Sequence, residues 1–110
     1  MIDWTRVAEL RDEIGPEDFD EVAELFLMEV EDTLEQLSGA KDDAAQMQDL
    51  LHFLKGSALN LGFSAVSEMC NAGEQDAAKG HVTVDIGGLK SLYTQSRAEY
   101  EAEYQKRFAA

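Results

Sequence analysis

His52, one of two histidines in this chain, stands in a setting that could support phosphoryl chemistry. A neutral imidazole nitrogen is a nucleophile toward phosphorus. The phosphoryl group that it takes needs a cation nearby, and Lys55 lies about one helical turn along the same face. Gly56 costs a helix interior about 1 kcal/mol relative to alanine, but it would leave room beside the imidazole for a partner. His81 follows Gly80 in a connector and has no such neighbours.

The elements that must position these residues are helices, because the apolar residues recur with a helical period and no segment alternates like a half-buried strand. We expect one short and four longer helices, over residues 3–13, 18–37, 42–61, 64–79 and 85–108. Four such helices with short connections form an antiparallel up-down four-helix bundle, and the short first helix would cap one end. The sequence therefore predicts an all-α fold in a single domain over residues 1–110.

Local signals set the expected helix ends. Asp18, with Glu21 three residues on, is a variant of the capping box at the start of the second helix. Gly62 stands where a helix C-terminus prefers glycine, and Ser64 is placed to cap the next helix. The glycines and the single proline fall between the apolar segments, as expected for breaks between helices.

The third helix should hold His52 at the surface. Its apolar stripe follows alternating three- and four-residue steps, through Ala44, Met47, Leu51, Leu54, Ala58 and Leu61. At about 100° per residue, His52 lies well away from the centre of that stripe and should point to solvent. Its neighbours three or four residues away are Gln48, Lys55, Gly56 and, further along the same face, Leu59. The second helix has more apolar residues than a single buried stripe requires. The additional ones are Leu25, Leu27 and Met28, which could add to the core or form an exposed docking patch.

Composition excludes several classes of function. The formal net charge is −14, and a surface this acidic repels nucleic-acid backbones and anionic lipid, so we expect neither as a partner. One cysteine cannot form an internal disulfide, and the start lacks the apolar run of a signal peptide, so we expect a cytoplasmic protein. A structural zinc site needs four Cys or His ligands, and the chain has only three such residues.

The segment from His52 to Phe63 resembles the phosphoacceptor helix and following turn of histidine phosphotransfer (HPt) domains. Their motif reads approximately His-x-Leu-Lys-Gly-Ser-(Ser/Ala), followed by Leu-Gly and an apolar residue. Cys70, Glu74 and Phe26 also stand where these domains often have Cys, Glu or Gln, and Phe. The resemblance extends over about residues 5–108, and its specificity is concentrated in residues 52–62.

The resemblance implies a phosphorelay intermediate that takes a phosphoryl group from a receiver-domain aspartate onto His52 Nε2 and passes it to a second receiver. Lys55 would steady the phosphoryl oxygens and Gly56 would give access. Gln48, Ser57 and Glu74 would be further site neighbours, with Glu74 on the next helix hydrogen-bonded near the imidazole.

The partners implied by the resemblance are response-regulator receiver domains and a hybrid histidine kinase that carries such a receiver domain. Magnesium belongs to the receiver in this scheme, so we expect no cofactor on the bundle itself. The chain has no nucleotide-binding motif, and we expect a monomeric phosphoryl carrier rather than an ATP-dependent kinase.

Two other classes are compatible with a helical bundle. A non-catalytic acidic helical adaptor would bind a partner through the same face, with His52 an ordinary surface residue. A metal-carboxylate bundle needs two Glu-x-x-His pairs on different helices. The only acid three residues before a helical histidine is Asp49, which turns away from the bundle seam, so we exclude that site. Cys70 is expected in the core.

Overall fold

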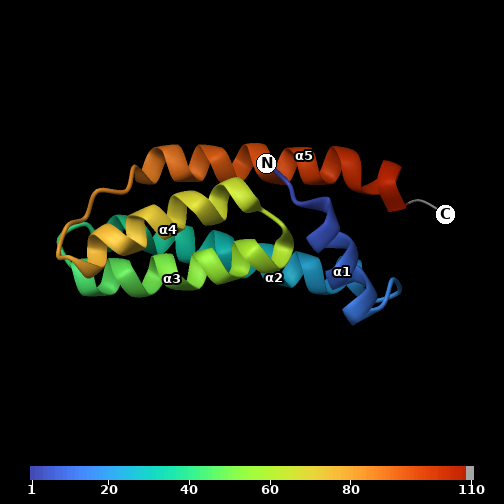
Figure 1. Cartoon of the computed structure of the whole chain (residues 1–110), viewed down its shortest axis with the longest axis horizontal. Helices are drawn as coiled ribbons and strands as arrows, with labels where there is room; N and C mark the ends of the chain where they lie inside the picture. The colour runs from blue at the N-terminus through green and yellow to red at the C-terminus, as the bar shows by residue number, and fades with distance from the viewer. Residues whose placement is uncertain (109–110) are drawn as a thin grey trace.

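Five α-helices make up the fold in a computed structural model that describes residues 1–108 (Figure 1). They are α1 (Trp4–Ile14), α2 (Phe19–Gln36), α3 (Ala44–Leu61), α4 (Ser64–Ala78) and α5 (Ile86–Phe108), with a 3-10 turn at Leu37–Ala40. No strand occurs in this part of the chain, and one isolated bridge pairs Ile2 with Phe63. The last two residues of the predicted domain, 109 and 110, lie outside the described residues. No helix within residues 1–108 is long and apolar enough to cross a membrane.

The four long helices run alternately up and down, and α1 lies across one end of α2 and α3 (Figure 1). The predicted all-α, antiparallel up-down bundle with a short capping helix is therefore confirmed. Each predicted helix matches an observed one within one or two residues at either end. The bundle is elongated, with extents of 48 × 21 × 20 Å, because α5 continues past the end of the other long helices to α1.

Caps define the helix that carries His52. The Asp43 carboxylate accepts a hydrogen bond from the backbone N–H of Gln46 at 3.0 Å, which starts α3. Gly62 ends α3 in the left-handed region, with φ of +79°. A side chain there would also meet the backbone oxygen of Asp3 at 2.7 Å and Val7 Cγ2 at 2.9 Å, because α1 packs against this turn. Gly62 is thus required both by its conformation and by the close approach of α1.

Two predicted caps are wrong. Asp18 precedes α2 with helical backbone angles and makes no side-chain cap hydrogen bond, so the Asp18–Glu21 capping box does not form. Ser64 is the first residue of α4 rather than its cap, and its hydroxyl donates instead to the backbone oxygen of Met1 at 3.0 Å. The chain entering α4 is positioned by contacts with the N-terminal residues, and the chain entering α2 by a local turn in which the Asp18 N–H donates to the Gly15 oxygen at 3.2 Å.

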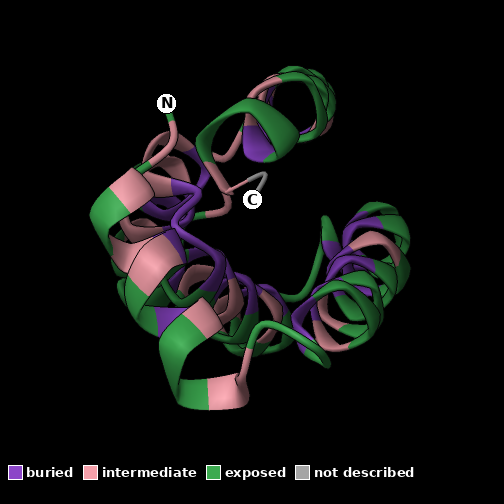
Figure 2. Ribbon diagram, turned by 90° about the vertical axis from the view of Figure 1, so that its right-hand side faces the viewer, coloured by how far each residue is buried: buried purple, intermediate pink, exposed green. Residues whose placement is uncertain are grey.

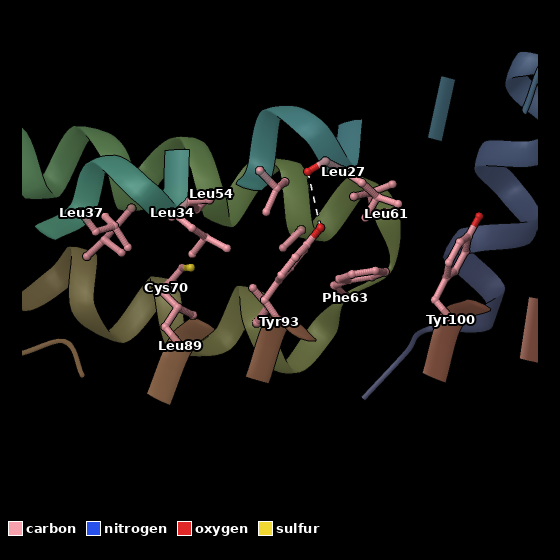
Figure 3. Packing of buried hydrophobic residues seen from close by; sticks show 14 of the residues in the cluster. Leu27, Leu34, Leu37, Leu54, Leu61, Phe63, Cys70, Leu89, Tyr93 and Tyr100 are labelled. Atoms are coloured by element: carbon pink, nitrogen blue, oxygen red, sulfur yellow. Dashed lines mark hydrogen bonds between the residues drawn. The ribbon is translucent and has the colours of Figure 1, made fainter. Parts of the chain in front are cut away.

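The core lies between the inward faces of the helices, and exposed residues cover the outside (Figure 2). Leu34 of α2 and Leu54 of α3 point toward Cys70 of α4 and Leu89 of α5, and all four are almost fully buried (Figure 3). The helical period of α2 predicts a buried stripe through Phe19, Val22, Phe26, Val30, Leu34 and Leu37. This stripe needs one correction, because Ala23 and Leu27 are buried whereas Val22 and Phe26 are only half-buried. The buried face of α2 is therefore rotated slightly from the one that the pattern indicated.

Aromatic side chains fix α1 and the end of α5 to each other. Trp4 stacks on Tyr100 with ring centroids 6.1 Å apart, and Arg107 lies over the Trp4 ring at 4.5 Å. Phe63, in the turn between α3 and α4, contacts Tyr93 and Tyr100 at 6.0 Å each. These contacts place Tyr93 and Tyr100 of α5 in the core, where both are buried.

Candidate functional site

α3 presents His52 to solvent because the residues around it in the helical repeat are committed to the core. Leu51 and Leu54 are fully buried, so the His52 side chain, on the opposite side of α3, is 71% exposed. The buried leucine side chains thus anchor the α3 backbone at His52 in the core, and the imidazole ring stays accessible to solvent.

A single carboxylate on α4 binds both His52 and Lys55. Oε2 of Glu74 lies 2.6 Å from Nδ1 of His52, and the Lys55 ammonium donates to Oε1 at 2.5 Å. The Glu74 side chain is only 12% exposed, whereas Lys55 is 25% exposed. The three side chains therefore form one hydrogen-bonded group at the seam between α3 and α4, with the imidazole at its outer end.

The close packing of α4 on α3 makes this contact feasible. Gly73, the residue before Glu74, faces α3, and a Cβ at that position would lie 2.9 Å from Leu51 Cδ1 and 3.1 Å from Val84 Cβ. The hydroxyl of Ser67 on α4 donates to the backbone oxygen of Lys55 at 3.4 Å. Small residues on α4 thus let the two helices approach until the Glu74 carboxylate spans the gap.

The charge state of Glu74 determines which nitrogen of His52 is available. The hydrogen bond from Lys55 is the main cause that lowers the pKa of Glu74, burial acts in the opposite direction, and the hydrogen bond with His52 lowers it further. At neutral pH the carboxylate is therefore ionised and can only accept hydrogen bonds. Nδ1 of His52 must then carry the hydrogen and donate it, so in the neutral ring the lone pair is on Nε2. The result is an exposed nucleophilic nitrogen of defined tautomer.

Gly56 leaves an opening beside the ring. No atom lies within 4 Å of a Cβ built at this position, so the fold itself does not require glycine there. Gly56 lies one turn beyond His52, about 40° round the helix. A side chain at this position would extend over the surface next to the imidazole, and its absence leaves the approach to His52 clear.

The remaining predicted site residues differ in their positions. Gln48 is half-buried and Leu59 is 54% exposed, and both lie on the His52 side of α3. Ser57 is half-buried and lies about 140° round the helix from His52, so it does not share the site. His81 is in the loop between α4 and α5, where its backbone N–H donates to the Asp76 oxygen at 2.9 Å.

The sequence analysis missed the contribution of Ser67, whereas it predicted the core position of Cys70. Ser67 ties α4 to the backbone of Lys55, and no motif indicated it because the contact joins two helices. Cys70, one turn before Glu74, is fully buried, and desolvation together with the Glu74 charge raises the pKa of its thiol to about 12. Cys70 is therefore a core residue beneath the site, and its thiol stays protonated.

The described residues contain no group of three or more His, Cys, Asp or Glu side chains arranged to hold a metal ion.

In comparisons with known proteins, the family model described as the Hpt domain matches residues 21–99, more than two thirds of the chain. No match was found among curated proteins or among solved structures. The matched segment includes all of α3 and α4, and hence the complete group of His52, Lys55 and Glu74.

Proposed function

Since the chain belongs to the Hpt domain family, which has a phosphotransfer role in phosphorelays, we propose that His52 is the residue that carries the phosphoryl group. The observation that supports this most directly is the hydrogen bond between His52 Nδ1 and the ionised Glu74, which leaves the exposed Nε2 as the nucleophile. A phosphorylated receiver domain is the donor, and a second receiver domain is the acceptor.

The reaction can proceed without moving a proton. The Nε2 lone pair attacks the phosphorus of the receiver's phospho-aspartate, the N–P bond forms, the acyl O–P bond breaks, and the aspartate leaves as a carboxylate. The ring keeps its Nδ1 hydrogen and becomes positively charged, next to the Glu74 carboxylate. In the second step a carboxylate oxygen of the acceptor attacks phosphorus, and the N–P electron pair returns to Nε2. Glu74 thus stabilises the positive charge that exists only while the ring is phosphorylated.

Lys55 and Gly56 act around this centre. The Lys55 ammonium is held by Glu74 beside the imidazole, and its flexible side chain lets it contact the oxygens of a phosphoryl group on Nε2. Gly56 leaves space for the loops of the receiver that bring the phospho-aspartate to His52. Gln48 and Leu59 line the same side of α3 and would contact the partner.

One bundle carries the entire site, so the proposed function needs only a monomer. We propose the cytoplasm as its location, where it would exchange phosphoryl groups with response-regulator receivers and with the receiver of a hybrid histidine kinase. The magnesium needed by the reaction belongs to those receivers.

The test is transfer from a phosphorylated receiver domain, with magnesium, to the wild type, His52→Gln and His81→Gln. His81→Gln is the matched control, because it removes the other histidine from a loop outside the site. We expect one acid-labile, alkali-stable phosphoryl group on the wild type and on His81→Gln, and none on His52→Gln. Equal labelling of His52→Gln, or no adduct with several receivers, would contradict the proposal and favour the acidic helical adaptor.

A further inference from the structure

The connection between α4 and α5, residues 79–85, is fastened to α4. It lies at the end of the bundle away from α1 (Figure 1). The backbone N–H of His81 donates to the backbone oxygen of Asp76 at 2.9 Å, and the Thr83 hydroxyl donates to the Asp76 carboxylate. One residue of α4 thus holds the connection at two points. We call residues 79–85 the strap.

Val84 of the strap covers Gly73 of α4. Val82 and Val84 are half-buried and pack against the core, whereas the residues before, between and after them are exposed. A Cβ built on the buried Gly73 would lie 3.1 Å from Val84 Cβ and 3.4 Å from Val84 Cγ2. The Val84 side chain therefore occupies part of the space that a side chain at position 73 would need.

Leu51 of α3 occupies the rest of that space. The same Cβ on Gly73 would lie 2.9 Å from Leu51 Cδ1. His52 directly follows Leu51, and Glu74 directly follows Gly73. The contact among Leu51, Gly73 and the strap therefore lies next to the two backbone positions that carry the hydrogen bond from Nδ1 of His52 to Oε2 of Glu74.

We propose that Gly73 and Val84 are positioning residues for the hydrogen bond between His52 and Glu74. Gly73 lets Leu51 come close to the α4 backbone, and Val84, held by the strap, fills the remaining space and keeps α4 at that distance. The bond is 2.6 Å long, so a shift of α4 by about 1 Å would stretch it past the roughly 3.2 Å limit of a normal hydrogen bond. The inference rests on the proposed function, because this bond selects the nucleophilic nitrogen of the ring.

The experiment is nitrogen NMR of the His52 ring in the unphosphorylated protein, at a pH where the ring is neutral. The ring shifts give the ratio of the Nδ1–H tautomer to the Nε2–H tautomer, and the signals that His52→Gln lacks identify the ring. Gly73→Ala adds the crowding methyl group, and Val84→Gly removes the side chain that covers Gly73. The double variant Gly73→Ala/Val84→Gly does both. Val82→Gly is the matched control, because it removes the other half-buried valine of the strap.

The tautomer ratio reports positioning, which global stability does not. Alanine at position 73 raises helix propensity and also crowds Leu51, so its effect on unfolding combines two opposite contributions. Circular dichroism and urea unfolding serve only to show that each variant is folded. Should Gly73→Ala fail to fold, Val84→Gly compared with Val82→Gly still decides the outcome.

We expect the Nδ1–H tautomer to exceed the other by more than about tenfold in the wild type, because Nδ1 donates to a charged group. Gly73→Ala should lower this ratio about fivefold and Val84→Gly about threefold, whereas Val82→Gly should leave it unchanged. The double variant should return to within about twofold of the wild type, since the new methyl group and Leu51 share the space that Val84 vacates. Acceptance of a phosphoryl group from a receiver should follow the same order.

A wild-type ratio in both Gly73→Ala and Val84→Gly would overturn the inference. Equal losses in Val84→Gly and Val82→Gly, or additive losses in the double variant, would overturn it as well. The transfer assay on the same proteins separates this failure from failure of the proposed function. The expected tautomer ratios without phosphoryl transfer to wild-type His52 would refute the phosphotransfer proposal and leave the positioning inference standing. Transfer to His52 with a ratio that no variant changes would do the reverse.

Discussion

Glu74→Gln is the substitution that separates the chemistry of the site from its fold. It keeps the length and shape of the side chain and removes its charge. The carboxylate serves two donors, one with each oxygen. A glutamine has one carbonyl oxygen, and its amide nitrogen can only donate, so it cannot accept from His52 and Lys55 together. Either the His52 tautomer or the position of Lys55 is lost in this variant.

The size of the effect follows from the kind of hydrogen bond that is lost. Hydrogen bonds to charged groups contribute about 1.5–3 kcal/mol, against about 0.5–1.5 kcal/mol for neutral pairs. The difference of about 1–1.5 kcal/mol corresponds to a rate about tenfold lower. The phosphorylated ring also loses the anion that stabilises its positive charge. We therefore expect Glu74→Gln to slow acceptance of the phosphoryl group about tenfold and Glu74→Ala to slow it about a hundredfold, whereas donation from the phosphorylated ring should not become slower.

The assay is rapid-quench measurement of transfer in both directions between a receiver domain and the wild type, Glu74→Gln and Glu68→Gln. Glu68 is an exposed acid on the same helix and forms no ion pair within the described residues, so its substitution controls for the change in net charge. Circular dichroism and urea unfolding check that α3 and α4 stay packed. In the absence of an acceptor, the adduct on Glu74→Gln should hydrolyse faster than the wild-type adduct, since the positive charge of its phosphorylated ring is no longer stabilised by a carboxylate.

Wild-type rates in both directions for Glu74→Gln would refute the assigned role of the carboxylate. A slower donation together with an unchanged acceptance would also refute it, because loss of the anion that stabilises the phosphorylated ring must slow acceptance rather than donation. If the transfer rate of Glu74→Gln fell only in proportion to its loss of helical circular dichroism signal, Glu74 would have a structural role and no role in the transfer step.

Further predictions concern the fold around the site. Gly56→Ala should stabilise the protein by about 0.5–1 kcal/mol in urea unfolding, because its Cβ meets open space in a helix, and should slow transfer from a receiver; faster transfer would contradict the proposed role in access. Gly62→Ala should destabilise by about 2–4 kcal/mol in the same measurement, since φ is +79° and the Cβ would meet Asp3. Burial and the raised pKa of Cys70 predict that a thiol reagent reacts only as fast as the native protein unfolds, and rapid modification without unfolding would disagree. The lowered pKa of Glu74 stabilises the fold above its ordinary value of 4.5, so the stability difference between wild type and Glu74→Gln should decrease as pH falls from 4.5 through the folded-state pKa; a difference that grows on acidification would contradict it.

Helix content and topology could be predicted because they depend on short-range patterns. On α3, the three- and four-residue spacing of the apolar residues from Met47 to Leu61 indicated both the helix and its buried side. Gly62 indicated where this helix ends. The predicted Ser64 cap was wrong for the complementary reason. Where the backbone on either side of a helix start is held by another part of the chain, as Met1 holds Ser64, the local signal no longer decides the hydrogen bond.

The sequence by itself determined the five helices, the exposure of His52 on α3 and the group of Lys55 and Gly56 beside it, because spacing within one helix sets the relative directions of its side chains. Only the tertiary structure decided that one Glu74 carboxylate binds both His52 and Lys55, and so which imidazole nitrogen carries the hydrogen. It also decided that Glu24 and Glu31 of α2 pair with Arg97, and Glu35 with Lys90. These features depend on how closely and at what angle two helices pack, and that geometry results from the whole core rather than from any single segment.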